Sequence, residues 1–75
     1  MQRKLSEMRY EEKGTVKTIE GEFREKVAGM GIRVGKEIKM LTKQPMRGPI
    51  VVVVDETKTS LGLEIAKKII VEVKK

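Results

Sequence analysis

The sequence carries few side chains with the chemistry that a catalyst needs. It contains neither cysteine nor histidine, which excludes thiolate and imidazole metal ligands together with the commonest general base. Adjacent carboxylates occur at Glu11-Glu12 and at Asp55-Glu56. Both pairs lie in segments expected to be exposed turns, without the apolar pocket that raises the pKa of a catalytic acid. We therefore expect no catalytic residues, no metal site and no cofactor, and we predict that the protein is not an enzyme.

A glycine-rich stretch superficially fits a phosphate-binding loop. The segment from Gly31 to Glu37 reads GIRVGKE. A phosphate loop needs four residues between its glycines and a serine or threonine after its lysine, and this segment meets neither condition. We instead expect Gly29 and Gly31 to end a helix in the left-handed conformation, and Gly35 to allow a turn.

These glycines belong to the stretch that organises the chain, from Gly14 to Leu41. Phe23, Val27 and Met30 recur there at the spacing of one helix face, and apolar residues alternate on both sides of them. A helix this short needs tertiary support, so we expect the flanking strands to hold it. The predicted elements are a strand over Thr15–Ile19, a helix over Glu22–Ala28 and a strand over Glu37–Leu41.

Turn residues divide the rest of the chain into further short elements. The first thirteen residues are polar, and we expect them to cross the edge of the domain with Leu5 and Met8 over the core. About five short strands with tight turns predict a mainly β fold, a small bent barrel with one or two short helices. The remaining predicted elements are a loop over Thr42–Pro49, a well-covered strand over Ile50–Val54, a turn over Asp55–Lys58, a very short strand over Thr59–Leu61, a helix over Gly62–Lys68 and a strand over Ile69–Val73.

Composition sets further bounds. Seventy-five residues suit one domain, which we place at residues 1–75. The longest apolar run, Ile50–Val54, is far shorter than the roughly 20 residues that span a bilayer; with no signal peptide visible, we expect a cytoplasmic protein. The net charge is +6. Because acids and bases are interspersed along the chain, we interpret this charge as that of a solvated surface. Attraction to nucleic acid, anionic lipid or an acidic partner is the alternative. The absence of asparagine is typical of a thermophile.

An ordered set of residues resembles a known family. The segment Phe23–Ile32 followed by Val34-Gly35 is similar to the signature R-x-x-L-x-x-M-G-[LI]-x-x-G of the FeoA family (ferrous iron transport protein A), although Val34 stands where proline is frequent. The residues near the end of the chain also resemble the closing part of the family's sequences, at Leu61, Ala66 and Ile69–Val71. The resemblance implies an SH3-like barrel and a small cytosolic accessory protein of ferrous iron uptake. Its implied partner is the FeoB-type membrane transporter, contacted at the inner face of the membrane, with no small-molecule substrate.

With this resemblance, we expect partner contacts around the short helix and the turn that follows it, with a nearby loop. The methionines are the expected apolar contacts and the arginines the expected polar rim. Met30 and Phe23 are also candidates for the core. The candidate partner-binding residues are Phe23, Arg24, Met30, Arg33, Met46 and Arg47.

The sequence leaves open two other functions besides the accessory role, and it also allows self-association. Gly14–Ile19 resembles the short strand of KOW-type nucleic-acid-binding modules, and the net charge suits phosphate contacts. Nucleic acid is nevertheless the disfavoured partner, because the chain has too few aromatic residues to stack bases. The chain also resembles the carboxy-terminal SH3-like domain of iron- or manganese-dependent repressors. Finally, an exposed edge strand at Ile69–Val73 would allow a weak homo-oligomer.

Overall fold

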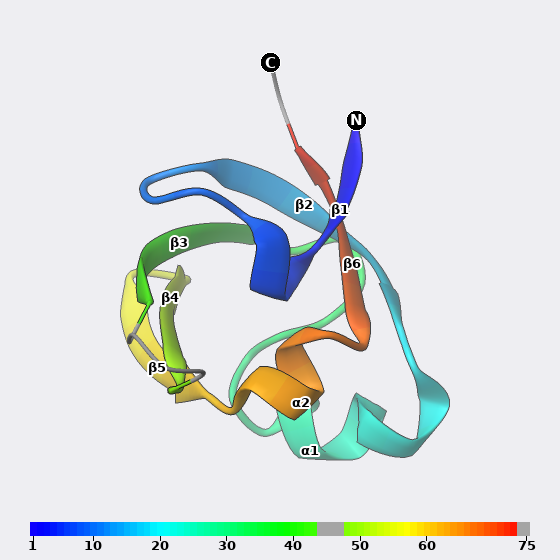
Figure 1. Ribbon diagram of the computed structural model, residues 1–75. Helices are drawn as coiled ribbons and strands as arrows, with labels where there is room; N and C mark the ends of the chain where they lie inside the picture. The colour runs from blue at the N-terminus through cyan, green and yellow to red at the C-terminus, as the bar shows by residue number, and fades with distance from the viewer. Residues whose placement is uncertain (44–47, 74–75) are drawn as a thin grey trace.

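The structure, a computed structural model, describes residues 1–43 and 48–73 of the chain. In this part of the chain, six strands form one antiparallel sheet in the order β1-β6-β2-β3-β4-β5. The strands are β1 (Gln2–Lys4), β2 (Lys13–Ile19), β3 (Glu37–Lys43), β4 (Ile50–Val54), β5 (Thr57–Leu61) and β6 (Ile69–Val73). The helical elements are the 3-10 turns η1 (Leu5–Glu7) and η2 (Gly21–Phe23) and the α-helices α1 (Arg24–Ala28) and α2 (Leu63–Ala66). The sheet curls around the core, and α1 and α2 lie at the same end of the molecule (Figure 1). The prediction of a mainly β, barrel-like fold is confirmed.

The strands β4 and β6 form at runs of β-branched apolar residues. In β4 and in β6, buried positions alternate with half-buried ones, so one face of each strand lines the core and the other is partly covered. Among the described residues, every buried side chain is apolar. Because full burial of one aliphatic side chain contributes about 1.5–3 kcal/mol, this shared interior is what closes so small a barrel.

The N-terminal residues contain a strand that the sequence did not predict. β1 is polar, yet it pairs with β6 along its whole length. Leu5 and Met8, which follow it, are fully buried, so the prediction that they cover the core is confirmed. The prediction that Ile69–Val73 is an exposed edge is wrong, because β6 lies between β1 and β2 and pairs with both. The two outer strands of the described sheet are β1 and β5.

Several element bounds differ from the predicted ones. The turn predicted over Asp55–Lys58 has only two residues, because Asp55 and Glu56 both adopt positive φ, 51° and 64°. This is the conformation of a type I′ hairpin turn, and it lets Val54 pair with Thr57. β5 therefore starts two residues earlier than predicted. β2 also starts earlier and β3 ends later than predicted, while α2 is shorter.

Candidate functional site

The short helix and the residues after it form a preorganised corner of the molecule. The helix predicted over Glu22–Ala28 begins as the 3-10 turn η2 and continues as α1. It ends in a Schellman motif, in which Ile32 N–H donates to the Val27 carbonyl at 3.0 Å and Gly31 N–H donates to the Ala28 carbonyl at 3.0 Å. Val27 and Ile32 are both fully buried and supply the apolar residues that accompany this motif.

Only one of the two glycines at this helix end adopts the predicted conformation. Gly31 has a φ of 86°, the left-handed region that a Schellman motif requires. Gly29 has a φ of −63° and is still in the helical conformation, so the prediction for this residue is wrong. The reason is that the chain keeps helical geometry beyond Ala28, and the left-handed residue comes only after that last turn.

A second turn follows at once and is anchored to the sheet. Lys36 N–H donates to the Arg33 carbonyl at 3.1 Å, and Gly35, at the third position, has a φ of 94°. This is the geometry of a type II turn. Gly35 N–H donates to the Val16 carbonyl at 2.8 Å, and Val16 N–H donates to the Lys36 carbonyl at 2.9 Å. Because both bonds reach β2, the turn holds Arg33 and Val34 in fixed positions.

These elements enclose a groove of about 390 Å³, here called the α1 groove. Its lining residues are Ile19, Arg24, Ala28, Ile32, Arg33 and Val34. Ile32 is fully buried and Ile19 nearly so, which makes the bottom of the groove apolar. Val34 has 56% of its surface exposed, an unusual exposure for an aliphatic residue in this chain. The volume of the α1 groove falls in the range of small binding pockets.

Two arginines rim the α1 groove. The Nε of Arg24 donates to the carbonyl of Ile19 at 3.2 Å. This bond fixes the guanidinium at the end of β2 and leaves its terminal nitrogens as donors for another group. Arg33 is exposed on the type II turn. Over the described residues, neither arginine forms an ion pair with an acidic side chain.

The structure brings two of the six candidate partner-binding residues together, because Arg24 and Arg33 both line the α1 groove. Phe23 and Met30 do not line it; they are partly buried and pack against the core. The other two candidates, Met46 and Arg47, lie outside the described residues.

The sequence reasoning missed the apolar part of the groove. Val34 carried a signal, since it is an apolar residue in a predicted turn, where proline would be frequent in the family. Ile19 and Ile32 carried none, because a buried residue at the bottom of a groove has the same pattern as any other core residue. Only the position of α1 beside Ile19 at the end of β2 separates the two cases.

A second hollow of about 310 Å³ lies on the outer face of the sheet. Its lining residues are Lys13, Glu37, Lys39, Val53, Asp55 and Glu56, so it mixes both signs of charge. Within residues 1–43 and 48–73, no group of three acidic side chains is placed to hold a metal ion. In the same residues, no helix is long and apolar enough to cross a membrane.

A bent antiparallel sheet with short helices at one end is the architecture of the SH3-like barrels, and this chain has that fold. A family model described as the FeoA domain matches residues 3–73, nearly the whole chain. The protein belongs to the FeoA family, which is associated with ferrous iron transport.

Solved structures agree with this assignment. The crystal structure of an iron uptake regulatory protein, FeoA, is 34% identical, with 99% of both chains covered and a TM-score of 0.89. A FeoA-like protein from Clostridium acetobutylicum is 36% identical over 96% of this chain and 86% of that one, with a TM-score of 0.84. FeoA from Stenotrophomonas maltophilia, solved with zinc, shares the fold at 24% identity, 96% and 89% coverage and a TM-score of 0.76. A comparison with curated proteins gives no significant match.

The expected similarity to metal-dependent repressors is also found. A manganese-dependent transcriptional repressor is 26% identical over 97% of this chain, with a TM-score of 0.87. This chain spans only 42% of that repressor. The similarity therefore concerns one part of the repressor.

Proposed function

We propose that this protein is a cytoplasmic accessory protein of ferrous iron uptake, one FeoA-like domain that binds the cytosolic part of an FeoB-type transporter. Membership of the FeoA family supports the link to iron transport. The α1 groove supports action through protein–protein contacts. The observation that carries the proposal is the exposed Val34 beside two arginines, since arginines around a desolvated apolar centre are typical of interface hot spots.

The size of the groove indicates the strength of the complex. At about 390 Å³ it accommodates one or two side chains of a partner and not a large surface. Interfaces at the small end of the usual range belong to transient complexes. We therefore expect a reversible complex with a dissociation constant on the order of micromolar, suited to regulation.

Calorimetric titration of the protein with the cytosolic region of a ferrous iron transporter tests the proposal. Val34→Asp places a carboxylate at the apolar groove and should weaken binding about tenfold or more, about 1.4 kcal/mol. Tyr10→Asp is the matched control, because Tyr10 is 63% exposed and lies outside the groove lining. The proposal is contradicted if the wild-type protein does not bind, or if the two variants bind equally well.

The alternative of nucleic-acid binding has one specific observation in its favour. The strand register places Lys13 opposite Lys39, Lys39 opposite Val53, and Val53 opposite Lys58. Three lysines therefore form one row across strands β2 to β5, here called the lysine row. Binding to nucleic acid through this row would weaken steeply as salt is added, whereas binding through the apolar groove would persist.

A further inference from the structure

We infer that the α1 groove recognises an acidic, aliphatic segment of its partner. An aspartate or glutamate carboxylate would lie between Arg24 and Arg33, and a neighbouring aliphatic side chain would enter the apolar bottom of the groove. This inference rests on the proposed function and specifies the chemistry of the segment that the transporter contributes. It is carried by the charge, the anchoring and the lining of the groove.

One of the two acidic residues adjacent in sequence to a groove residue is already engaged. Glu20 directly follows the groove residue Ile19, yet its carboxylate pairs with Lys68 at 3.6 Å. Asp55 pairs with Lys36, the last residue of the type II turn, at 2.8 Å. In the part of the chain that the structure describes, no carboxylate takes either arginine of the groove as its partner.

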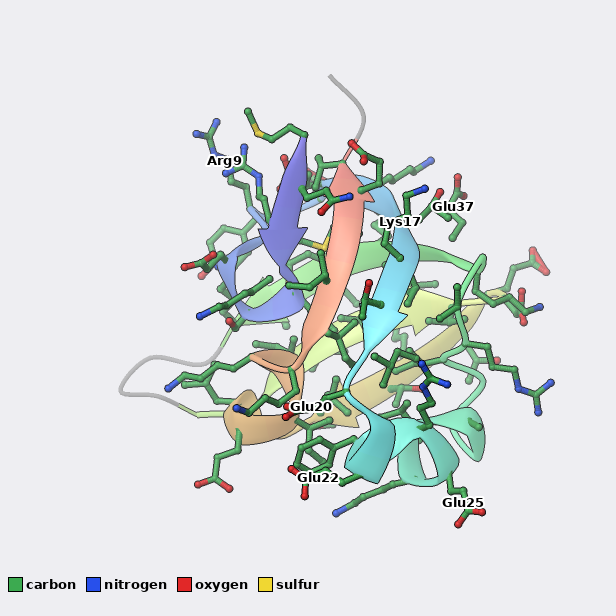
Figure 2. The ribbon with its side chains drawn as sticks, turned by 90° about the vertical axis from the view of Figure 1, so that its right-hand side faces the viewer. Arg9, Lys17, Glu20, Glu22, Glu25 and Glu37 are labelled. Atoms are coloured by element: carbon green, nitrogen blue, oxygen red, sulfur yellow. The ribbon has the colours of Figure 1, made fainter. Side chains whose placement is uncertain are left out.

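The acidic residues of the helical segment do not neutralise the groove. Figure 2 shows Glu22 and Glu25 pointing outward at the helical end of the molecule, away from the sheet. The same view shows Glu20 between α2 and the end of β2, where Lys68 is its partner. The two guanidinium groups are therefore left as uncompensated positive charges beside an apolar surface, which favours an incoming anion.

One of the two guanidinium groups is also held in place. The Arg24 guanidinium is fixed by its bond to the Ile19 carbonyl, whereas the turn bonded to β2 fixes only the backbone of Arg33. A guanidinium fixed in this way still offers parallel N–H groups that match the two oxygens of a carboxylate. Because less side-chain freedom is lost on binding, such anchoring raises affinity without adding contacts.

The apolar lining decides between anions. Inorganic phosphate and a nucleic-acid backbone offer the arginines oxygen atoms but leave the exposed Val34 uncovered. A segment such as leucine next to glutamate satisfies both halves of the groove, since the aliphatic group covers the apolar residues and the carboxylate meets the guanidinium groups. A metal cation is disfavoured by the two positive charges.

A pair of small probes tests this chemistry on the intact protein. 4-Methylpentanoate carries an aliphatic group and a carboxylate, and 4-methylpentanamide has nearly the same shape without the charge. Titrated while amide NMR signals are recorded, the acid should shift the signals of Ala28, Arg33 and Val34, with a dissociation constant on the order of millimolar for so small a ligand. The amide should bind at least about fivefold more weakly, because charge-assisted hydrogen bonds are roughly twice as strong as neutral ones.

Variants assign the effect to the two arginines. Arg24→Gln and Arg33→Gln should each weaken binding of the acid severalfold, and the double variant should remove its preference over the amide. Lys26→Gln is the matched control, because it removes one positive charge from α1 outside the groove lining and should leave the preference unchanged. Arg33→Lys keeps the charge but loses the planar pair of donors, so it should fall between the wild type and Arg33→Gln. Unchanged amide spectra away from the groove show that each variant is folded.

The outcomes separate this inference from the proposed function. Equal shifts by acid and amide, stronger binding of inorganic phosphate at the same signals, or an intact preference in the double variant would each overturn the inference. If the transporter binds the wild type and the double arginine variant equally while Val34→Asp fails to bind, the proposed function stands and the acidic segment is wrong. If the acid binds as expected but the transporter does not, the proposed function fails and the groove keeps its selectivity for aliphatic carboxylates.

Discussion

At the scale of single residues, the end of α1 depends on one glycine. Gly31 has a φ of 86°, whereas Gly29 has a φ of −63°. We predict that Gly31→Ala costs about 1–2 kcal/mol, because a side chain disfavours the left-handed conformation. A steric clash does not cause this loss of stability, since the nearest atom to an added methyl group would be the Val54 Cγ1 at 4.0 Å. Thermal unfolding measures the effect, because each kcal/mol lost lowers the Tm by about 4–8 °C in a domain of this size.

Gly29→Ala is the internal control for this prediction. Its added methyl group would meet the Lys26 carbonyl oxygen at 3.5 Å, an ordinary contact. Because alanine favours helical geometry over glycine, this variant should be neutral or more stable by up to about 1 kcal/mol. Equal destabilisation by both variants would contradict the Schellman assignment.

These two glycines also show where sequence reasoning stops at this scale. The sequence predicted that the Gly29-Met30-Gly31 segment ends the helix, and the structure confirms it. It did not distinguish which glycine is left-handed, because both have the same intrinsic freedom. That choice is made by the burial of Ile32, which must turn back onto Val27. Arg24 and Arg33 were predicted for one contact surface, but the groove that they line with Ile19 and Ile32 could not be predicted, because it depends on bonds from the turn to β2.

At the scale of elements, β1 is the strand that sequence patterns could not reveal. Gln2, Arg3 and Lys4 show no apolar alternation, and they become a strand because β6 offers them a backbone to pair with. The strand is tied at its start, where the Met1 carbonyl accepts a bond from Val73 N–H at 2.7 Å. β4, predicted from five consecutive β-branched residues, and β6, predicted from apolar residues on one face, were predicted with their observed bounds.

The attachment of β1 should depend on pH. The Met1 ammonium donates to the Glu72 carboxylate, and this hydrogen bond holds the pKa of Glu72 below its ordinary value of 4.5. Because the folded pKa is the lower one, the contact stabilises β1 fully above pH 4.5 and is lost as the pH falls through the folded pKa. Protonation should therefore loosen β1 while the rest of the sheet stays intact.

Hydrogen exchange followed by NMR checks this prediction. The protection factor of the Val73 amide should fall about two- to fivefold as the pH is lowered from 6 through the folded pKa of Glu72, as for an exposed ion pair. The Met40 amide, which donates to the backbone carbonyl of Glu12 at 2.9 Å in another part of the sheet, is the internal reference. Glu72→Gln should show the reduced protection already at pH 6, without a further change on acidification. A parallel fall at Val73 and Met40 would indicate global unfolding instead.

At the scale of the whole molecule, two surfaces divide the chemistry of binding between them. The α1 groove is apolar with two arginines, and the lysine row crosses the sheet from β2 to β5. Lys13 lies directly opposite Lys39, an arrangement of like charges that weakens a sheet. Replacing the row should therefore make the protein slightly more stable, by a few tenths of a kcal/mol.

Replacing the charges of the lysine row distinguishes which of the two surfaces binds the transporter. The triple variant Lys13→Gln, Lys39→Gln, Lys58→Gln should bind the transporter within twofold of the wild type, because the row lies outside the groove lining. Its residual binding to duplex DNA should lose salt dependence, with the log–log slope smaller by up to about 2.7 if each lysine contacts one phosphate. A variant with Lys4, Lys26 and Lys67 replaced by glutamine removes the same charge elsewhere and should change the slope less. If the lysine row proves necessary for transporter binding while Val34→Asp has no effect, the functional surface is the sheet face and not the α1 groove.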